Sequence, residues 1–240
     1  GIWQQQNAVF GAGYGMEHVN YFAADGEEAF EIPSFRRSNA FAAVAAECRA
    51  VRTAVGINEV HNFSKFLIDG PDAESWLDRI MAGRLPETGH LTLSPLLSPR
   101  GRLFGDFTIS RLDDSVFQLT ASYGSQNFHQ RWFENHMPPS GVRLQNISRQ
   151  RLGFQIAGPL ARELLSRVAR GDVSNAALPF LGVRNLQIGP CEAIVQRVSY
   201  TGDLGYEIYV PAAQQVALYN ELVRGGVDLG LRPFGMRAMM

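Results

Sequence analysis

The sequence predicts an α+β fold made of two related halves with antiparallel sheets. The main support is an internal repeat, FLIDGPDAESWLDRI at 66–80 and FQIAGPLARELLSRV at 154–168, in which Gly70 and Gly158 lie 88 residues apart. Each copy has the pattern of a strand that enters a helix through Gly-Pro. A chance recurrence of this common turn is the alternative. Two related halves that face each other create a cleft, where ligands commonly bind.

Further segments with strand character follow each copy of the repeat. They are 103–110 and 116–122 after the first copy, and 192–199 and 205–210 after the second. Residues 205–210 alternate, so that Tyr206 and Ile208 lie on one face and Glu207 and Tyr209 on the other. These segments supply the strands of the two predicted sheets.

Helical patterns and one unpatterned segment complete the assignment. Residues 1–38 carry aromatics and glycines without clear periodicity and are assigned as a connecting segment. The alanine-rich stretch 39–55 has helical composition, with apolar residues spaced for one helical face. Phe63–Ile68 has the pattern of a strand, and Pro71 then opens a helix through Ile80, because proline is tolerated in the first helical turn. Residues 212–224 form a short amphipathic helix.

The bulk composition excludes several classes of protein. The 240 residues are 45% hydrophobic and 19% charged, with a net charge of −1, which disfavours binding to nucleic acid through phosphate contacts. No apolar run approaches the length that spans a bilayer, and no secretory signal is present, so neither a membrane nor a secretory role is predicted. The two cysteines, Cys48 and Cys191, form no C-x-x-C motif, and no histidines have metal-ligand spacing. A reducing compartment, cytoplasmic or matrix-like, is expected, and no metal site is predicted.

Two carboxylates on predicted strands are the candidates for chemistry. Asp106 lies within SPRGRLFGDFTIS (98–110), in the middle of a strand, where aspartate is disfavoured. Glu207 lies on the strand after the turn of SYTGDLGYEIYV (199–210), beside a glycine that leaves room for a flat ligand. Tyr200, before that turn, can stack on such a ligand or simply pack. For both acids the alternative is an ordinary residue on a solvated strand face.

Three motifs in order resemble one family. YTGDLGYEIYVP is similar to the YTG-[ED]-x-G-[FY]-E-I-x-[VLI]-P signature of the aminomethyltransferase family, the T-protein of the glycine cleavage system. GPDAESWLDRI resembles the Gly-Pro-Asp-Ala helix of that family, and SPRGRLFGDFTI resembles its Gly-Gly-x-x-Asp-Asp strand. The resemblance extends over about 50–240. Lys65-Phe66, the spacing of Pro86 and Gly89, and His129-x-x-Trp132 are similar to a subgroup, the folate-binding half of dimethylglycine and sarcosine dehydrogenases.

The resemblance implies a T-protein-like fold, tetrahydrofolate as the ligand and a one-carbon donor as the second small molecule. By motif position Asp106 falls on the catalytic aspartate, and Glu207 and Tyr200 fall on residues that bind the folate. Leu93 and Ser122 fall on two further folate-contacting positions, a tyrosine and an asparagine in the T-protein. The subgroup implies a one-carbon transfer to folate that gives 5,10-methylenetetrahydrofolate.

The same subgroup implies a larger protein. In it a flavin domain that binds FAD precedes the folate-binding half, so residues 1–38 are expected to connect to such a domain. Residues 39–240 are expected to form the aminomethyltransferase-like domain, truncated at its C-terminus. The chain begins at Gly1 and stops at Met240, which favours a fragment of a longer polypeptide.

Departures from the family pattern leave two alternatives open. Gly105 replaces the first acid of the Asp-Asp pair, Leu93 and Ser122 replace the tyrosine and the asparagine, and Met239 falls near a family arginine. One alternative is another folate-dependent transfer, by an aminomethyltransferase or a demethylase of sulfur or oxygen methyl groups. The other is a non-catalytic folate-binding scaffold, although YTGDLGYE lacks the cysteine of the scaffold relatives.

Overall fold

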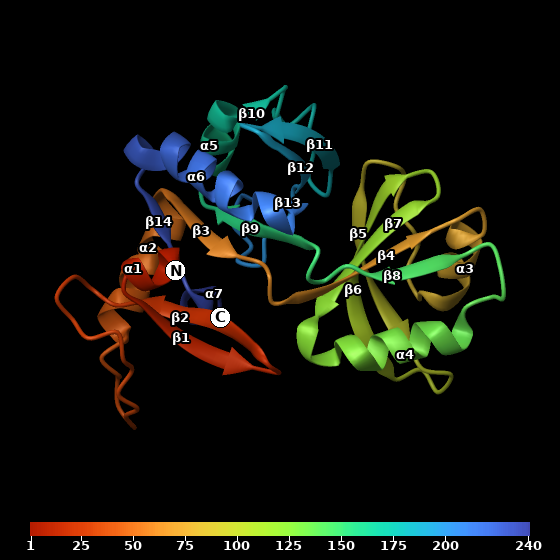
Figure 1. The fold of residues 1–240 in the computed structure, drawn as a ribbon, viewed down its shortest axis with the longest axis horizontal. Helices are drawn as coiled ribbons and strands as arrows, with labels where there is room; N and C mark the ends of the chain where they lie inside the picture. Colours follow the sequence, from red (N-terminus) through yellow and green to blue (C-terminus); the bar gives the residue numbers. More distant parts are fainter.

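The computed structural model describes residues 1–240 and contains two similar α+β units joined side by side (Figure 1). Each unit has a sheet covered by two helices on its outer face, and the two sheets turn their other faces toward each other. A third, smaller part, made by the N-terminal hairpin and neighbouring helices, lies beside the second unit. The predicted fold class, two related halves with antiparallel sheets, is confirmed, apart from one parallel pair of strands at the edge of the second sheet.

The first unit, on the right of Figure 1, holds a five-stranded sheet with strand order β5-β6-β7-β4-β8. In chain order its elements are β4 (Phe63–Asp69), α3 (Ala73–Ile80), β5 (Leu91–Leu97), β6 (Leu103–Asp113), β7 (Val116–Ser122), a 3₁₀ turn (Tyr123–Ser125), α4 (Gln126–His136) and β8 (Arg143–Asn146). The apolar face of this sheet packs against α3 and α4 through a core that includes Phe66, Trp76 and Phe133. That core uses one face of the sheet only, and this leaves the other face free to carry polar groups.

The second unit holds a seven-stranded sheet with strand order β10-β11-β12-β13-β9-β3-β14. Its elements are β3 (Val55–Glu59), β9 (Arg151–Ala157), α5 (Ala161–Val168), β10 (Ala169–Arg170), β11 (Val183–Ile188), β12 (Cys191–Gln196), β13 (Gly205–Pro211), a 3₁₀ turn (Ala212–Gln214), α6 (Gln215–Gly226), a second 3₁₀ turn (Val227–Leu229) and β14 (Leu231–Pro233). Its core joins Ile156 and Ile208 to Leu164 and Leu222 of the covering helices. The order β11-β12-β13-β9-β3 repeats the order β5-β6-β7-β4-β8 of the first unit.

The N-terminal segment is more structured than the sequence suggested. Residues 1–38 have no clear periodicity, but they contain α1 (Ile2–Gln5) and a hairpin of β1 (Ala8–Gly13) and β2 (Met16–Phe22). Glycines and aromatics in the hairpin hide its alternation. The hairpin packs with α2 (Phe41–Thr53) and α7 (Met236–Met239), and both chain ends lie in this region (Figure 1).

Several strands were missed or misjudged in length. The second-half segment 192–199 ends as β12 at Gln196, because the chain leaves the sheet to form the loop that carries Tyr200. The sequence predicts no strand at β3, β5, β8, β10, β11 or β14. These are edge strands or strands without regular alternation, where packing decides rather than pattern. None of the helices combines the length and the apolar composition that a bilayer-spanning helix requires.

The two Gly-Pro turns show why the repeat is a structural one. Gly70 and Gly158 have φ of +125° and +131°, a region that only glycine adopts readily. A Cβ atom on Gly70 would lie 2.4 Å from the carbonyl oxygen of Gly141, and one on Gly158 would lie 2.5 Å from that of Ala54. Both glycines therefore let a neighbouring main chain close against the strand end.

We expect Gly158→Ala to lower the free energy of unfolding by more than about 1 kcal/mol, because the new Cβ meets backbone atoms at an unfavourable φ. Urea unfolding measures the effect. Gly13→Ala is the control, since its nearest neighbour lies 3.7 Å away. Equal costs for the two variants would contradict the explanation.

Candidate active site

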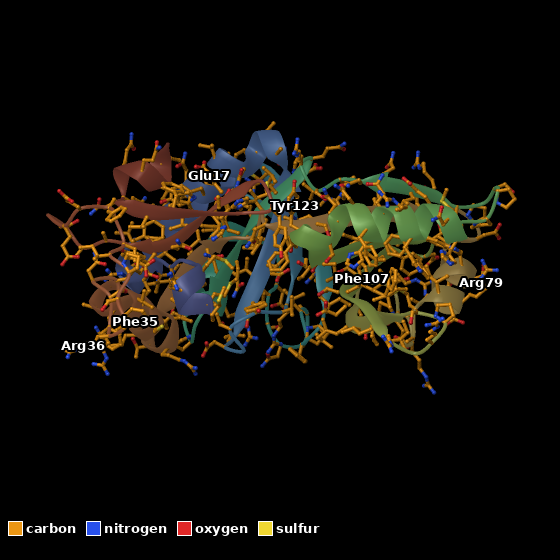
Figure 2. The ribbon with its side chains drawn as sticks, turned by 90° about the horizontal axis from the view of Figure 1, so that it is seen from below. Glu17, Phe35, Arg36, Arg79, Phe107 and Tyr123 are labelled. Atoms are coloured by element: carbon orange, nitrogen blue, oxygen red, sulfur yellow. The ribbon has the colours of Figure 1, made fainter.

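A cavity of about 670 Å³ lies where the two units and the hairpin meet. The first unit contributes the middle of β6 and the end of β7, and the second contributes β13 and the loop before it. The hairpin contributes its tip, Gly13 and Tyr14. Figure 2 shows Tyr123, one of the lining residues, near the middle of the molecule, with Phe107 further inside the first unit. The cavity has the size typical of small-molecule sites.

All five residues predicted for the site line this one cavity: Asp106, Glu207, Tyr200, Leu93 and Ser122. They come from β6, β13, the loop before β13, β5 and β7, so the fold gathers them from both units. Leu93 and Tyr200 are 69% and 60% exposed, which leaves their side chains available to a ligand. The roles assigned to the five residues remain predictions.

Glu207 is half-buried and held by Tyr209 on the same strand. The Tyr209 hydroxyl donates a hydrogen bond of 2.6 Å to Oε2 of Glu207. Burial raises the pKa of the Glu207 carboxyl above its ordinary value, whereas the hydrogen bond from Tyr209 and the charge of Lys65 act in the opposite direction. Burial and the nearby Glu207 raise the pKa of Tyr209 well above its ordinary value. The tyrosine therefore stays a hydrogen-bond donor at neutral pH.

Lys65 supplies a buried positive charge behind this pair. It lies on β4, is fully buried, and donates from Nζ to the carbonyl oxygens of Phe63 and Val60 at 3.0 and 3.2 Å. Its ammonium also lies 5.5 Å from the centre of the Tyr209 ring. Burial lowers the pKa of Lys65 to about 8, and the charge of Glu207 opposes that shift. The lysine is thus mainly charged at neutral pH and stabilises the Glu207 carboxylate.

A polar row across the second sheet surrounds Glu207. The strand register places Gln196 and Gln155 directly beside Glu207 on the two neighbouring strands. Both glutamines are fully buried, and neither side-chain amide has a hydrogen-bond partner. Since buried polar atoms normally have partners, this row favours a polar group next to Glu207.

Asp106 lies on the opposite side of the cavity, on β6, and its side chain is exposed. The preceding residue explains one departure from the family pattern. A Cβ atom on Gly105 would lie 2.4 Å from Nε2 of His129, whose ring packs 4.7 Å from the ring of Phe107. The buried His129 ring therefore occupies the space that a side chain at Gly105 would need, and burial lowers the pKa of His129.

The hairpin and the C-terminus close two further sides of the cavity. Tyr14, at the hairpin tip, reaches the first unit, where its ring fills the space beside Gly124. Met239, which aligns near a family arginine, is buried in α7 and lines the cavity as an apolar group. The segment assigned as a simple connection thus takes part in the site.

Sequence reasoning missed Tyr209 and Lys65 as parts of the site. The alternation of β13 already placed Tyr209 on the face of Glu207, so a signal for it was present. Lys65 gave a weaker signal, a single charge inside an apolar strand. His129 belongs to the His129-x-x-Trp132 motif of the resemblance, but nothing in the sequence indicates its packing against Gly105, because that contact joins residues that are distant in the sequence.

Comparisons with known proteins agree on one family. The chain matches the model of the "GCVT N-terminal domain" family over residues 1–240. It is 32% identical to the mitochondrial dimethylglycine dehydrogenase of Homo sapiens over 100% of the chain, but only 28% of that protein. It is 28% identical to the aminomethyltransferase of Desulforamulus reducens over 91% of the chain and 60% of that protein. The chain therefore spans less than two thirds of these relatives.

A solved structure has the same fold. The glycine cleavage system aminomethyltransferase T of Bartonella henselae superposes with a TM-score of 0.78 at 21% sequence identity, over 99% of this chain and 58% of that one. At this identity the likeness concerns the fold.

We expect Tyr209→Phe to raise the pKa of Glu207 further, because the carboxylate loses the hydrogen bond that favours its charged form. An NMR titration of ¹³C-labelled glutamate side chains measures this pKa. Tyr206→Phe is the control, since the Tyr206 hydroxyl bonds Arg162 on the other face of β13. An unchanged or lower pKa of Glu207 in Tyr209→Phe would contradict the assignment.

We expect Gly105→Ala to destabilise the protein by about 1–3 kcal/mol through overpacking against His129. The cost should shrink when His129 is also replaced by alanine, because the ring that the new Cβ meets is then absent. A double-mutant cycle by urea unfolding measures the coupling. Equal costs of Gly105→Ala in both backgrounds would show that another contact is responsible.

Proposed function

The chain belongs to the GCVT N-terminal domain family, and on this premise we propose that it is the tetrahydrofolate-binding part of a flavin-dependent N-methyl amine dehydrogenase. The proposed reaction passes a one-carbon unit from an oxidised methylamine of the dimethylglycine or sarcosine type to tetrahydrofolate, which gives 5,10-methylenetetrahydrofolate. The resemblance to dimethylglycine dehydrogenase over the whole chain supports this choice.

The observation that carries the proposal is a pair of acids, Glu207 and Asp106, on two sides of one cavity. The cavity of about 670 Å³ gathers both acids and all three other predicted residues from separate elements. Aromatic side chains, among them Phe63 and Tyr123, also line it. A flat heterocycle with a polar edge fits such walls.

Glu207 suits the recognition of a pterin edge. This edge presents an amino group and a ring N–H side by side, and a carboxylate can accept both in a charge-assisted pair. Tyr209 fixes one carboxylate oxygen and Lys65 stabilises the negative charge. The two unpartnered glutamines beside Glu207 offer further donors and acceptors. The residues present therefore fit the ligand.

Asp106 suits proton transfer near the reacting nitrogens. Bound tetrahydrofolate would supply the nitrogen nucleophile that receives the one-carbon unit. The exposed carboxylate of Asp106, fixed on a strand, accepts the proton that this nitrogen loses or orients the N–H bond toward the donor. The walls of the cavity hold the reactants in position, and most of the rate enhancement is assigned to this positioning.

The oxidation itself is assigned to a flavin domain that binds FAD, preceding this part in the same protein. The chain spans 28% of the human dimethylglycine dehydrogenase, which leaves room for such a domain in a protein of that size. We propose a cytoplasmic or mitochondrial-matrix setting, the second in line with the mitochondrial relative. The methylated amine used as substrate would be bound at the flavin.

We expect Glu207→Gln to weaken tetrahydrofolate binding by about ten-fold or more, because a neutral amide cannot replace both charge-assisted hydrogen bonds. Asp106→Asn should keep most of the affinity and lose the transfer. Because the pKa of Glu207 is raised, the wild-type affinity should fall as the pH drops through that pKa, at a pH above the ordinary glutamate range.

Titration calorimetry of the protein with tetrahydrofolate, in wild type and in each variant, measures the affinities. Asp78→Asn is the control, because the side chain of this exposed aspartate on α3 makes no hydrogen bond or ion pair. The folding of each variant is checked by circular dichroism. A folded wild type that binds no tetrahydrofolate, or a Glu207→Gln variant with unchanged affinity, would overturn the proposal.

A further inference from the structure

A second cavity, of about 810 Å³, lies between the two sheets and away from the candidate active site. β11, β12 and β13 of the second unit line one side, and the β6–β7 turn and β8 of the first unit line the other. No residue lines both cavities. The proposed function uses none of its residues except Tyr209, whose hydroxyl bonds Glu207.

The second cavity is the counterpart of the first under the internal repeat. In the first unit the strand register aligns Leu93, Thr108, Thr120 and Lys65 in one row across the sheet. In the second unit the corresponding row is Asn185, Ile194, Tyr209 and Gly153. All residues of the first row except Lys65 line the first cavity. All residues of the second row except Gly153 line the second cavity.

This correspondence extends to the catalytic position. Asp106 precedes Thr108 by two residues, and Glu192 precedes Ile194 by two residues, each on its own cavity wall. The second cavity therefore carries an acid at the place where the first carries Asp106. The floors of the two cavities differ in charge. Under the repeat, Arg151 on β9 corresponds to Phe63 on β4. Gln118 on β7 corresponds to Glu207 on β13.

Arg151 is the feature that indicates a ligand. Its guanidinium is half-buried and donates a 2.6 Å hydrogen bond to the side-chain oxygen of Gln118. It forms no ion pair with any acid of the protein. Burial lowers the pKa of Arg151, and the buried Lys65 lies nearby as a second cation. A buried charge normally has a partner, and the planar guanidinium is suited to a carboxylate.

The rim of the cavity carries the opposite charge. Glu192 and Asp113 are exposed acids that line it and form no ion pair. The β12–β13 pairing ends at Ile194 and Tyr209, and continuing that register by two residues sets Glu192 level with Pro211, which pairs with Arg151. Glu192 and Arg151 therefore lie two strands apart, about 10 Å between main chains. Their side chains and one small zwitterion can bridge that gap.

We propose that this second cavity binds a free α-amino acid, with its carboxylate on Arg151 and its ammonium toward Glu192. Apolar residues of the walls, including Val116 and Ile194, contact the side chain of the bound amino acid. The site is separate from the proposed tetrahydrofolate site, and its occupation does not depend on that function. Because Tyr209 lines the second cavity and bonds Glu207, the occupied site contacts the residue that positions the Glu207 carboxylate.

The test is an NMR titration of the ¹⁵N-labelled full chain with each of the standard amino acids in turn. We expect at least one to shift the amide signals of Asn185 and Glu192 saturably. Arg151→Gln should weaken its binding by about ten-fold or more, and Arg151→Lys by less, because the charge is kept. Arg149→Gln is the matched control, an exposed arginine two residues away that makes no side-chain hydrogen bond.

Two further variants test the role of Glu192 and the independence of the two cavities. Glu192→Gln should weaken the binding of the amino acid but not the binding of the same molecule without its amino group. Because Glu192 is exposed, we expect this variant to fold normally. Tyr200→Ala should leave amino-acid binding unchanged, because Tyr200 lines only the first cavity, and this result separates the site from the tetrahydrofolate site. Binding of no amino acid by the folded chain, or unchanged affinity in folded Arg151→Gln, would overturn the proposal.

Discussion

The centre of this molecule depends on two sheets that meet through polar faces. Each sheet packs its apolar face against its own pair of helices, so that each unit has its own core. The inner faces carry Lys65, Gln118, Gln155, Gln196 and Glu207, which are costly to bury without partners. Two apolar faces would pack closed, whereas these polar faces leave cavities between the sheets. The same constraint therefore produces both the scaffold and the candidate sites.

The buried charges at this interface are arranged around Glu207. Lys65 and Arg151 are the cations, and Glu207 is the acid. Burial raises the pKa of Glu207, and the hydrogen bond from Tyr209 acts in the opposite direction. Tyr209 connects the two sheets, because its hydroxyl bonds Glu207 of the second sheet and its ring lies beside the Lys65 ammonium of the first. A carboxylate held in this way is oriented before a ligand arrives, which lowers the cost of ordering it on binding. This preorganisation is what a site that works mainly by positioning requires.

The internal repeat gives the two cavities a common geometry and different chemistry. Gly-Pro turns with positive φ at Gly70 and Gly158 set the same strand-to-helix path in both units. The side chains then diverge, as Phe63 and Arg151 illustrate. One cavity presents a carboxylate to a polar edge, and the other presents a guanidinium. A duplicated scaffold can thus retain its backbone while each copy acquires its own binding chemistry.

Local patterns in the sequence determined the fold class, the repeat, the face of β13 that carries Glu207, and the motifs of the family. They could do so because period-two and helical spacing, and the need for glycine at a positive φ, act over a few neighbouring residues. The tertiary structure alone decided that Lys65 lies beside Tyr209 and that His129 fills the space at Gly105. It also decided that the β1–β2 hairpin closes one side of the first cavity. The same packing leaves Arg151 with no acidic side chain as an ion-pair partner. Alternation shows which face a side chain takes, but only long-range packing determines which residues lie across from it.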